Sequence, residues 1–72
     1  MKWDEVEKGS DSYTSFTTQA NEFKDEIVFH ETWDAEWHTA YLYDEVEKDW
    51  VELGEFSNFE SAEQAIERKR NA

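Results

Sequence analysis

The chain contains no cysteine and no proline, and only two of its 72 residues are glycine. The lack of cysteine excludes disulfide bonds and thiolate metal sites. No stretch approaches the roughly 18 consecutive apolar residues that a membrane-spanning helix needs. The first twenty residues also lack an apolar run, so we expect no signal peptide and a cytoplasmic protein without membrane contacts.

Basic residues are scarce as well. Seven lysines and arginines stand against 19 aspartates and glutamates, which gives a formal net charge of −12 at pH 7. A field of one sign repels nucleic acid and anionic membranes and attracts basic surfaces, many of which are built to hold DNA or RNA. We therefore expect a basic protein partner and no direct binding of nucleic acid. Three of the seven cations lie near the C-terminus, at Arg68, Lys69 and Arg70.

Aliphatic side chains are few: the chain has two leucines, two isoleucines and four valines, and with phenylalanine these types make 13 of 72 residues. So low a share at high net charge is typical of disordered chains. Four tryptophans, three tyrosines and five phenylalanines offset it, since each aromatic side chain can bury about 150–250 Å². We expect one folded domain over residues 1–72, of marginal stability at this size.

The second half of the chain has the alternation of strands and then the periodicity of a helix. Along residues 36–46, Trp37, Tyr41 and Tyr43 alternate with residues that include Ala40 and Leu42, which places the two sets on opposite faces. The expected sheet spans residues 26–56, with strands at 27–32, 36–46 and 50–56, a connection at 33–35, a turn at 47–49 and an interruption at Gly54.

A helix is expected over residues 57–70. Ser57 with Glu60 three residues later forms a capping box, and Asn58 is an alternative cap. The basic residues 68–70 complement the negative end of the helix dipole.

The first 25 residues allow two interpretations. A hairpin would pair a strand at 13–18 with 23–32 through a turn at 19–22, while Phe16, Ala20 and Phe23 would also fit one face of a helix. Frequent serine, threonine and asparagine favour the hairpin. Gly9 is expected to mark a turn after a short N-terminal segment. The predicted fold class is α+β: an antiparallel sheet of three to five short strands with one C-terminal helix packed on one face.

Residues 27–69, about sixty percent of the chain, resemble the three-strand-plus-helix fold of the AP2 domain and the integrase arm-binding domains. The motifs are Trp37 with Ala40 and Leu42-Tyr43-Asp44, then Trp50-Val51-x-Leu53-Gly54-x-Phe56, then Phe56 with Glu60 and Ala62 at the helix entry. The resemblance implies a sheet that contacts DNA through Arg and Lys on the face opposite the helix. Here Lys48 is the only cation between Glu26 and Phe56, so DNA binding by this sheet is not expected.

Residues that could carry chemistry are sparse. His30, Glu31 and Asp34 approach the helical H-E-x-x-H zinc motif, and Glu36 and His38 could add to a mixed site across a hairpin. A β-rich segment would scatter these side chains, so we expect no metal and no cofactor. No glycine-rich phosphate loop or serine with a neighbouring base is present, and 72 residues leave little room for a water-excluding pocket. We therefore expect no enzymatic activity.

The aromatic side chains that face away from the expected helix have two interpretations. They form a partner-binding surface, because aromatics rimmed by charge are typical of interface hot spots. Alternatively, the N-terminal hairpin, with Trp3, Tyr13 and Phe16, folds over them and completes a core. The sequence leaves both open.

The spacing of the carboxylates suggests a function. Alternate side chains on a β-strand repeat at about 7 Å, similar to successive phosphates along one DNA strand, so an acidic sheet can imitate a duplex. The candidate partner-binding residues are Glu31, Glu36, Asp44, Glu45, Glu47, Glu52, Glu55, Trp37, Tyr41 and Trp50. Asp4, Glu5 and Glu7 could extend this acidic array.

In composition the chain is similar to the small acidic DNA-mimic proteins that phages and mobile elements encode, including anti-CRISPR proteins. This similarity implies an inhibitor, monomeric or homodimeric, that acts in the host cytoplasm on a basic nucleic-acid-binding protein or CRISPR effector complex. The alternative is a small acidic structural or protein-interaction domain, for example from a high-salt organism, with no nucleic-acid-related target.

Overall fold

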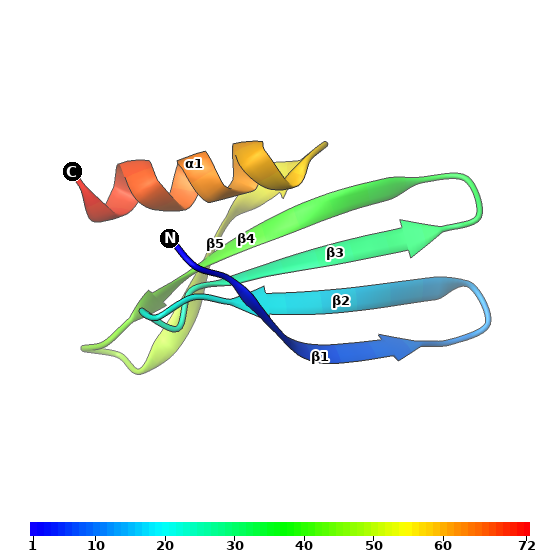
Figure 1. Ribbon diagram of the computed structural model, residues 1–72, viewed down its shortest axis with the longest axis horizontal. Coiled ribbons are helices and arrows are strands. Elements are labelled where there is room, and N and C mark those ends of the chain that lie inside the picture. Colours follow the sequence, from blue (N-terminus) through cyan, green and yellow to red (C-terminus); the bar gives the residue numbers. More distant parts are fainter.

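The computed structural model describes residues 1–72 as one antiparallel sheet with a single helix (Figure 1). The strands follow one another in space in the order β1-β2-β3-β4-β5, each antiparallel to its neighbours. Their bounds, with that of the helix, are β1 Asp4–Ser10, β2 Thr14–Ala20, β3 Glu26–Thr32, β4 Glu36–Asp44, β5 Asp49–Phe56 and α1 Phe59–Arg70. The predicted α+β class and the C-terminal helix are confirmed.

Three of the four hairpin turns are closed by an aspartate or asparagine side chain. In each turn one side-chain oxygen accepts hydrogen bonds from two backbone N–H groups two to four residues later: Asp11 in β1–β2, Asn21 in β2–β3 and Asp44 in β4–β5. Such side chains tie a turn together without proline. The hairpin of β2 and β3 is confirmed, and the helical alternative for this segment is wrong.

The two glycines lie inside strands. The expected turn at Gly9 is wrong: Gly9 pairs with Phe16 within the β1–β2 ladder, and the turn follows at residues 11–13. A Cβ at Gly9 would lie 2.7 Å from the Phe16 ring, so glycine is required here for close packing. Gly54, at φ +137°, accompanies a register shift opposite Ala40 and Tyr41, which confirms the expected interruption as a β-bulge.

The helix begins at Phe59 rather than Ser57, because Asn58 provides the cap. The Asn58 side chain accepts a hydrogen bond from the backbone N–H of Ser61 at 2.8 Å. With 12 residues, α1 is too short to cross a membrane.

A small core lies between α1 and strands β3 to β5, where Ile27 and Ala40 of the sheet meet Ala62 and Ile66 of the helix. Partly buried side chains surround these four residues: Trp3, Leu42, Leu53, Phe56 and Phe59. Trp3 reaches the helix from the N-terminus, where its indole N–H donates to Glu63 at 2.7 Å.

Arg70, the last residue of α1, is tied to the sheet by an ion pair. Its Nε donates to Oδ2 of Asp25 at 2.6 Å and its Nη2 donates to Oδ1. The Asp25 side chain is fully buried and also accepts from Asn21 and from the backbone N–H of Tyr43. Burial alone would raise the pKa of this carboxyl, but these hydrogen bonds and the charge of Arg70 together hold the pKa below its ordinary value.

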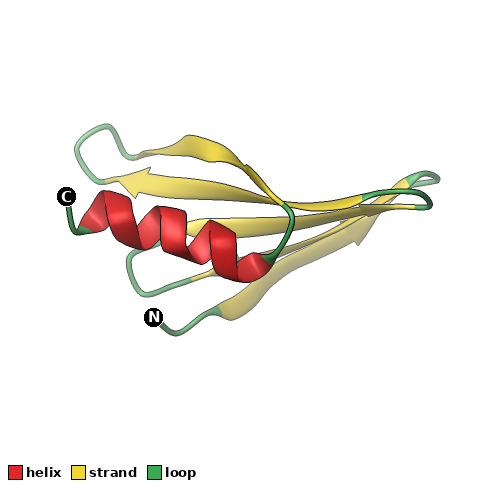
Figure 2. Ribbon diagram, turned by 90° about the horizontal axis from the view of Figure 1, so that it is seen from above, coloured by secondary structure: helices red, strands yellow, loops and turns green.

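The sheet has a helix on one face only. Figure 2 shows α1 along one side of the strands. The β1–β2 hairpin continues the sheet sideways, so it does not fold over the opposite face. The alternative in which Tyr13 and Phe16 cover the outward-facing aromatics is therefore wrong. The face without a helix remains open.

Candidate functional site

The strand register defines which side chains share the open face. Directly opposed residues of an antiparallel sheet lie on the same face, and Ile27 and Ala40 lie under α1. Residues of the opposite parity therefore form what we term the helix-free face. Its members include Asp4, Glu7, Phe16, Thr18, Glu26, Val28, His30, Trp37, Thr39, Tyr41, Tyr43, Trp50, Glu52 and Glu55.

Carboxylates cross the helix-free face from one edge strand to the other. We term Glu7, Glu26, Glu52 and Glu55 the acidic band, with Tyr41 among them. Two adjacent rows of the register hold these residues: Asp4, Ala20, Glu26, Tyr41 and Glu52 in one, and Glu7, Thr18, Val28, Thr39 and Glu55 in the other.

The electrostatics show that the acidic band is contiguous. Burial, and then the charges of Glu52, Glu55 and Glu26, raise the pKa of the Tyr41 phenol. Burial, and then the charge of Glu7, raise the pKa of the Glu26 carboxyl. The charge of each carboxylate thus shifts the pKa of a neighbouring group across the sheet.

No lysine or arginine occupies a strand position on this face. The seven cations lie before β1 (Lys2), on the helix side of β1 (Lys8), in turns (Lys24, Lys48) and in the last turn of α1 (Arg68, Lys69, Arg70). The strand positions of the helix-free face therefore carry only acidic charges, while the Lys24 ammonium reaches this face from the β2–β3 turn and lies 5.3 Å from the centroid of the Tyr43 ring.

Aromatic side chains on the helix-free face are held by cross-strand partners. Trp37 stacks on His30, with ring centroids 5.1 Å apart and planes at 15°. Tyr43 packs against Trp50 at 5.0 Å, and the Trp50 indole donates to the carbonyl of Lys24 at 2.7 Å. Held in this way, the rings can bind a partner with little loss of conformational entropy.

The structure brings together half of the residues predicted for the site. Trp37, Tyr41, Trp50, Glu52 and Glu55 share the helix-free face. The other five lie elsewhere: Glu31 and Glu36 on the helix side at the β3–β4 end, and Asp44, Glu45 and Glu47 around the β4–β5 turn.

Of the acidic band, Glu26 was absent from the predicted set, and Glu7 was expected only as an extension of the acidic array. Glu7 enters it through the register of β1, which shifts between Glu5 and Glu7. Glu26 enters it from the start of β3. The charge pattern of residues 4–7 was visible in the sequence, but the bulge that sets which carboxylate faces outward was not.

The two histidines point to opposite sides of the sheet, because His30 pairs with Trp37 on the helix-free face and His38 pairs with Phe29 on the other. The rings of Phe29 and Phe59 lie against His38, and burial lowers the pKa of its imidazole, opposed by Glu36. No three histidine, aspartate or glutamate side chains converge as a metal site would require.

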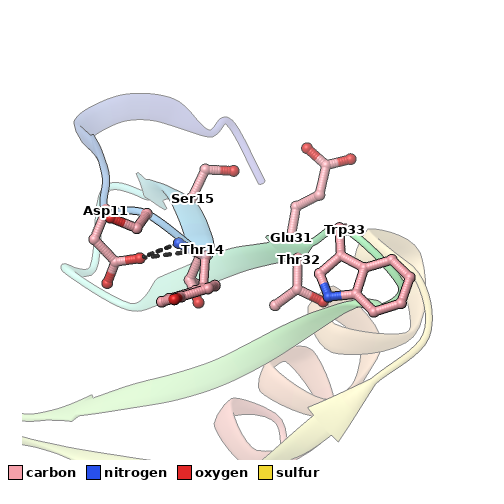
Figure 3. Close-up of a pocket in the computed structure, with 8 residues that line it drawn as sticks. Asp11, Thr14, Ser15, Glu31, Thr32 and Trp33 are labelled. Carbon is pink, nitrogen blue, oxygen red and sulfur yellow. Dashed lines mark hydrogen bonds between the residues drawn. The ribbon is translucent and has the colours of Figure 1, made fainter.

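A second exposed feature lies at the distal end of the sheet, away from the helix. The β1–β2 and β3–β4 loops flank a hollow of about 280 Å³ there (Figure 3). It is lined by Asp11, Ser12, Tyr13, Thr14, Ser15, Glu31, Thr32 and Trp33. Backbone hydrogen bonds from Tyr13 and Thr14 lower the pKa of the Asp11 carboxyl and fix one wall.

Comparisons with protein-family models, with curated proteins and with solved structures found no match.

Proposed function

We propose that this protein is an inhibitor that binds the basic nucleic-acid-binding surface of another protein, with the acidic band in place of phosphates. The observation that carries the proposal is the acidic charge of the strand positions on the helix-free face, which hold carboxylates on β1, β3 and β5 and no lysine or arginine. A basic surface is the partner that such a face attracts, because opposite potentials steer the encounter and fix the register.

The spacing of the edge carboxylates supports DNA mimicry. Glu52 and Glu55 lie two register positions apart on β5, and so do Asp4 and Glu7 on β1. Two positions along a strand correspond to about 7 Å, and four interstrand steps separate the edges by about 19 Å. The two pairs thus lie on opposite edges of the sheet, as two phosphate backbones lie on opposite sides of a groove, with Glu26 and Tyr41 between them.

Effectors that hold a nucleic-acid duplex in a positively charged channel are the partner class we favour, CRISPR effector complexes among them. Carboxylates of the band would pair with the lysines and arginines of the channel, and Trp37 and Tyr41 would supply the apolar contact. An anti-CRISPR-like inhibitor of this kind would act in the cytoplasm of the host cell.

Charge reversal at one edge tests the proposal. The variant Glu52→Lys/Glu55→Lys changes the acidic band, and Glu22→Lys/Glu47→Lys makes the same change in net charge at exposed turn residues. We expect immobilised wild-type protein to capture a nucleic-acid-binding protein that duplex DNA elutes. The band variant should bind that partner at least about 100-fold more weakly, since close interfacial charge pairs are worth about 2–5 kcal/mol.

The control variant should lose far less affinity, because it alters only the long-range field. Equal losses in the two variants would contradict the proposal, as would a captured partner that DNA does not displace. The alternative, an acidic structural domain of a high-salt organism, instead predicts a melting temperature that rises steeply with KCl and no basic partner.

A further inference from the structure

Two aromatic side chains stand almost free at the distal end of the sheet. Trp33 is 88% exposed and Tyr13 is 79% exposed, and both line the hollow of Figure 3 although they belong to different hairpins. Tryptophan is enriched at interface hot spots, so a tryptophan this exposed is a candidate contact for a partner. We term residues 31–36 with Tyr13 the distal tip.

The other three tryptophans are engaged within the chain. Trp3 donates to Glu63, Trp50 donates to the carbonyl of Lys24, and Trp37 stacks on His30. Trp33 has neither a hydrogen bond nor a ring partner in the structure. Its indole is therefore available to a ligand on both faces.

Two shallow hollows adjoin Trp33. One has a volume of about 280 Å³ and the other about 420 Å³, and Glu31, Thr32 and Trp33 line both. Neither contains a lysine or an arginine among its lining residues. Each has room for a planar polar group beside the indole ring.

The carboxylates next to Trp33 lack a counter-charge. Glu31 and Glu36 are directly opposed across β3 and β4, an arrangement that is destabilising for like charges. The single ion pair of the molecule, Arg70 with Asp25, lies at the other end of the sheet. A cation placed between Glu31 and Glu36 would relieve their repulsion.

The chain itself contains an example of the chemistry that fits such a site. The Arg70 guanidinium lies over the Phe23 ring, 4.7 Å from its centroid, and donates two hydrogen bonds to the Asp25 carboxylate. A planar guanidinium can stack on a ring and bind a carboxylate at once, whereas the compact ammonium of lysine cannot stack.

We propose that the distal tip binds an arginine side chain of the basic partner, with the guanidinium stacked on Trp33 and hydrogen-bonded to Glu31 and Glu36. This inference rests on the proposed function, because it names the anchor by which the basic surface is held. The tip lies beyond the acidic band at the end of the sheet, and its two carboxylates belong to the helix side, so it would hold the partner at a point separate from the band.

The four indole N–H groups are natural reporters of position. In an NMR titration of ¹⁵N-labelled protein with tetra-arginine amide, we expect the Trp33 signal to shift at the lowest peptide concentration. Tetra-lysine amide should need about tenfold more peptide to produce the same shift, because it cannot stack. Trp33→Ala should weaken arginine-peptide binding about tenfold, while Val46→Ala, an equally exposed apolar residue in the β4–β5 turn, should leave binding unchanged.

Three results would overturn the inference: a Trp33 signal that does not move first, equal binding of the two peptides, or full affinity in Trp33→Ala. Shifts confined to Trp37 and Trp50 would place the peptide on the helix-free face, which keeps the proposed function and removes the tip as an anchor. If none of the four signals moves, the inference about the tip is wrong, and the capture experiment with Glu52→Lys/Glu55→Lys decides the proposed function separately.

Discussion

Asp25 shows at the scale of one residue how a small acidic protein keeps a charge inside. Its side chain is fully buried, yet every hydrogen bond it receives comes from a donor fixed by another element or by its own turn. The arginine that completes this set is the last residue of α1. The ion pair therefore serves as the attachment of the helix end to the sheet.

Replacing Arg70 should leave a buried carboxylate without its counter-charge. We expect Arg70→Ala to lower the free energy of unfolding by about 3 kcal/mol, since breaking a buried pair by removing one partner is strongly destabilising. Lys69→Ala, at an exposed position in the same helical turn, is the matched control and should cost little. Urea denaturation measures both, and a loss below about 1 kcal/mol in Arg70→Ala would show that the pair does not anchor the helix.

His38 should make stability depend on pH near neutrality. Burial lowers its folded-state pKa below the ordinary 6.5, so folded and unfolded chains are both neutral at His38 above that pH. As the pH falls below 6.5, the unfolded chain binds a proton first and stability is lost. In denaturation at pH 7.5 and 5.5, wild type should lose more stability than His38→Phe; identical losses would exclude this origin.

At the scale of elements, the cap of α1 distinguishes two interpretations that the sequence left open. Asn58, not Ser57, accepts the hydrogen bond from the first helical turn. Asn58→Ala should therefore cost about 1 kcal/mol, whereas Ser57→Ala should have little effect. Thermal unfolding of the two variants measures the difference, and the reverse order would restore the capping box at Ser57.

Elements with a strong local pattern were predictable from sequence. The alternation of residues 36–44 and the periodicity of α1 gave both elements within two residues of their observed ends. β1 had no such pattern, because its exposed charges and Gly9 resemble a loop until Phe16 packs over the glycine. The packing of Phe16 against Gly9, a tertiary contact, favours a strand for residues 4–10.

The candidate site was half predictable for a related reason. Alternation within β4 and β5 correctly placed Trp37, Tyr41 and Glu52 on one face. Which strands adjoin them, and in which register, depends on two bulges and on the in-plane position of the β1–β2 hairpin. The bulge in β1 determines that Glu7 joins the band, whereas the regular register of β3 and β4 places Glu26 on the helix-free face and Glu31 and Glu36 on the other.

At the scale of the whole molecule, the charge that suits a basic partner opposes folding. A net charge of −12 repels itself in the compact state, and the acidic band concentrates part of that charge on one side. The raised pKa of Glu26, caused by burial and by Glu7, is the local sign of this cost. The acidic band thus lowers the stability of the fold in the region that we propose binds the partner.

This cost can be measured through pH. The pKa of Glu26 in the folded chain lies above its ordinary value of 4.5. The charged carboxylate, present at higher pH, therefore destabilises the fold. Glu26→Gln should raise the melting temperature at pH 7, and the gain should vanish as the pH falls to about 4. Glu47→Gln, which removes a charge from an exposed turn, should raise it less. A larger rise in melting temperature for Glu47→Gln would show that the destabilisation does not come from the surroundings of Glu26.

The central claim is that the acidic band and duplex DNA compete for one basic surface. The most direct measurement is the fluorescence anisotropy of a labelled duplex bound to the captured partner while this protein is added. We predict complete release of the duplex, at higher protein concentrations when more duplex is present. A labelled duplex that stays bound while this protein also binds, in a ternary complex, would contradict the account.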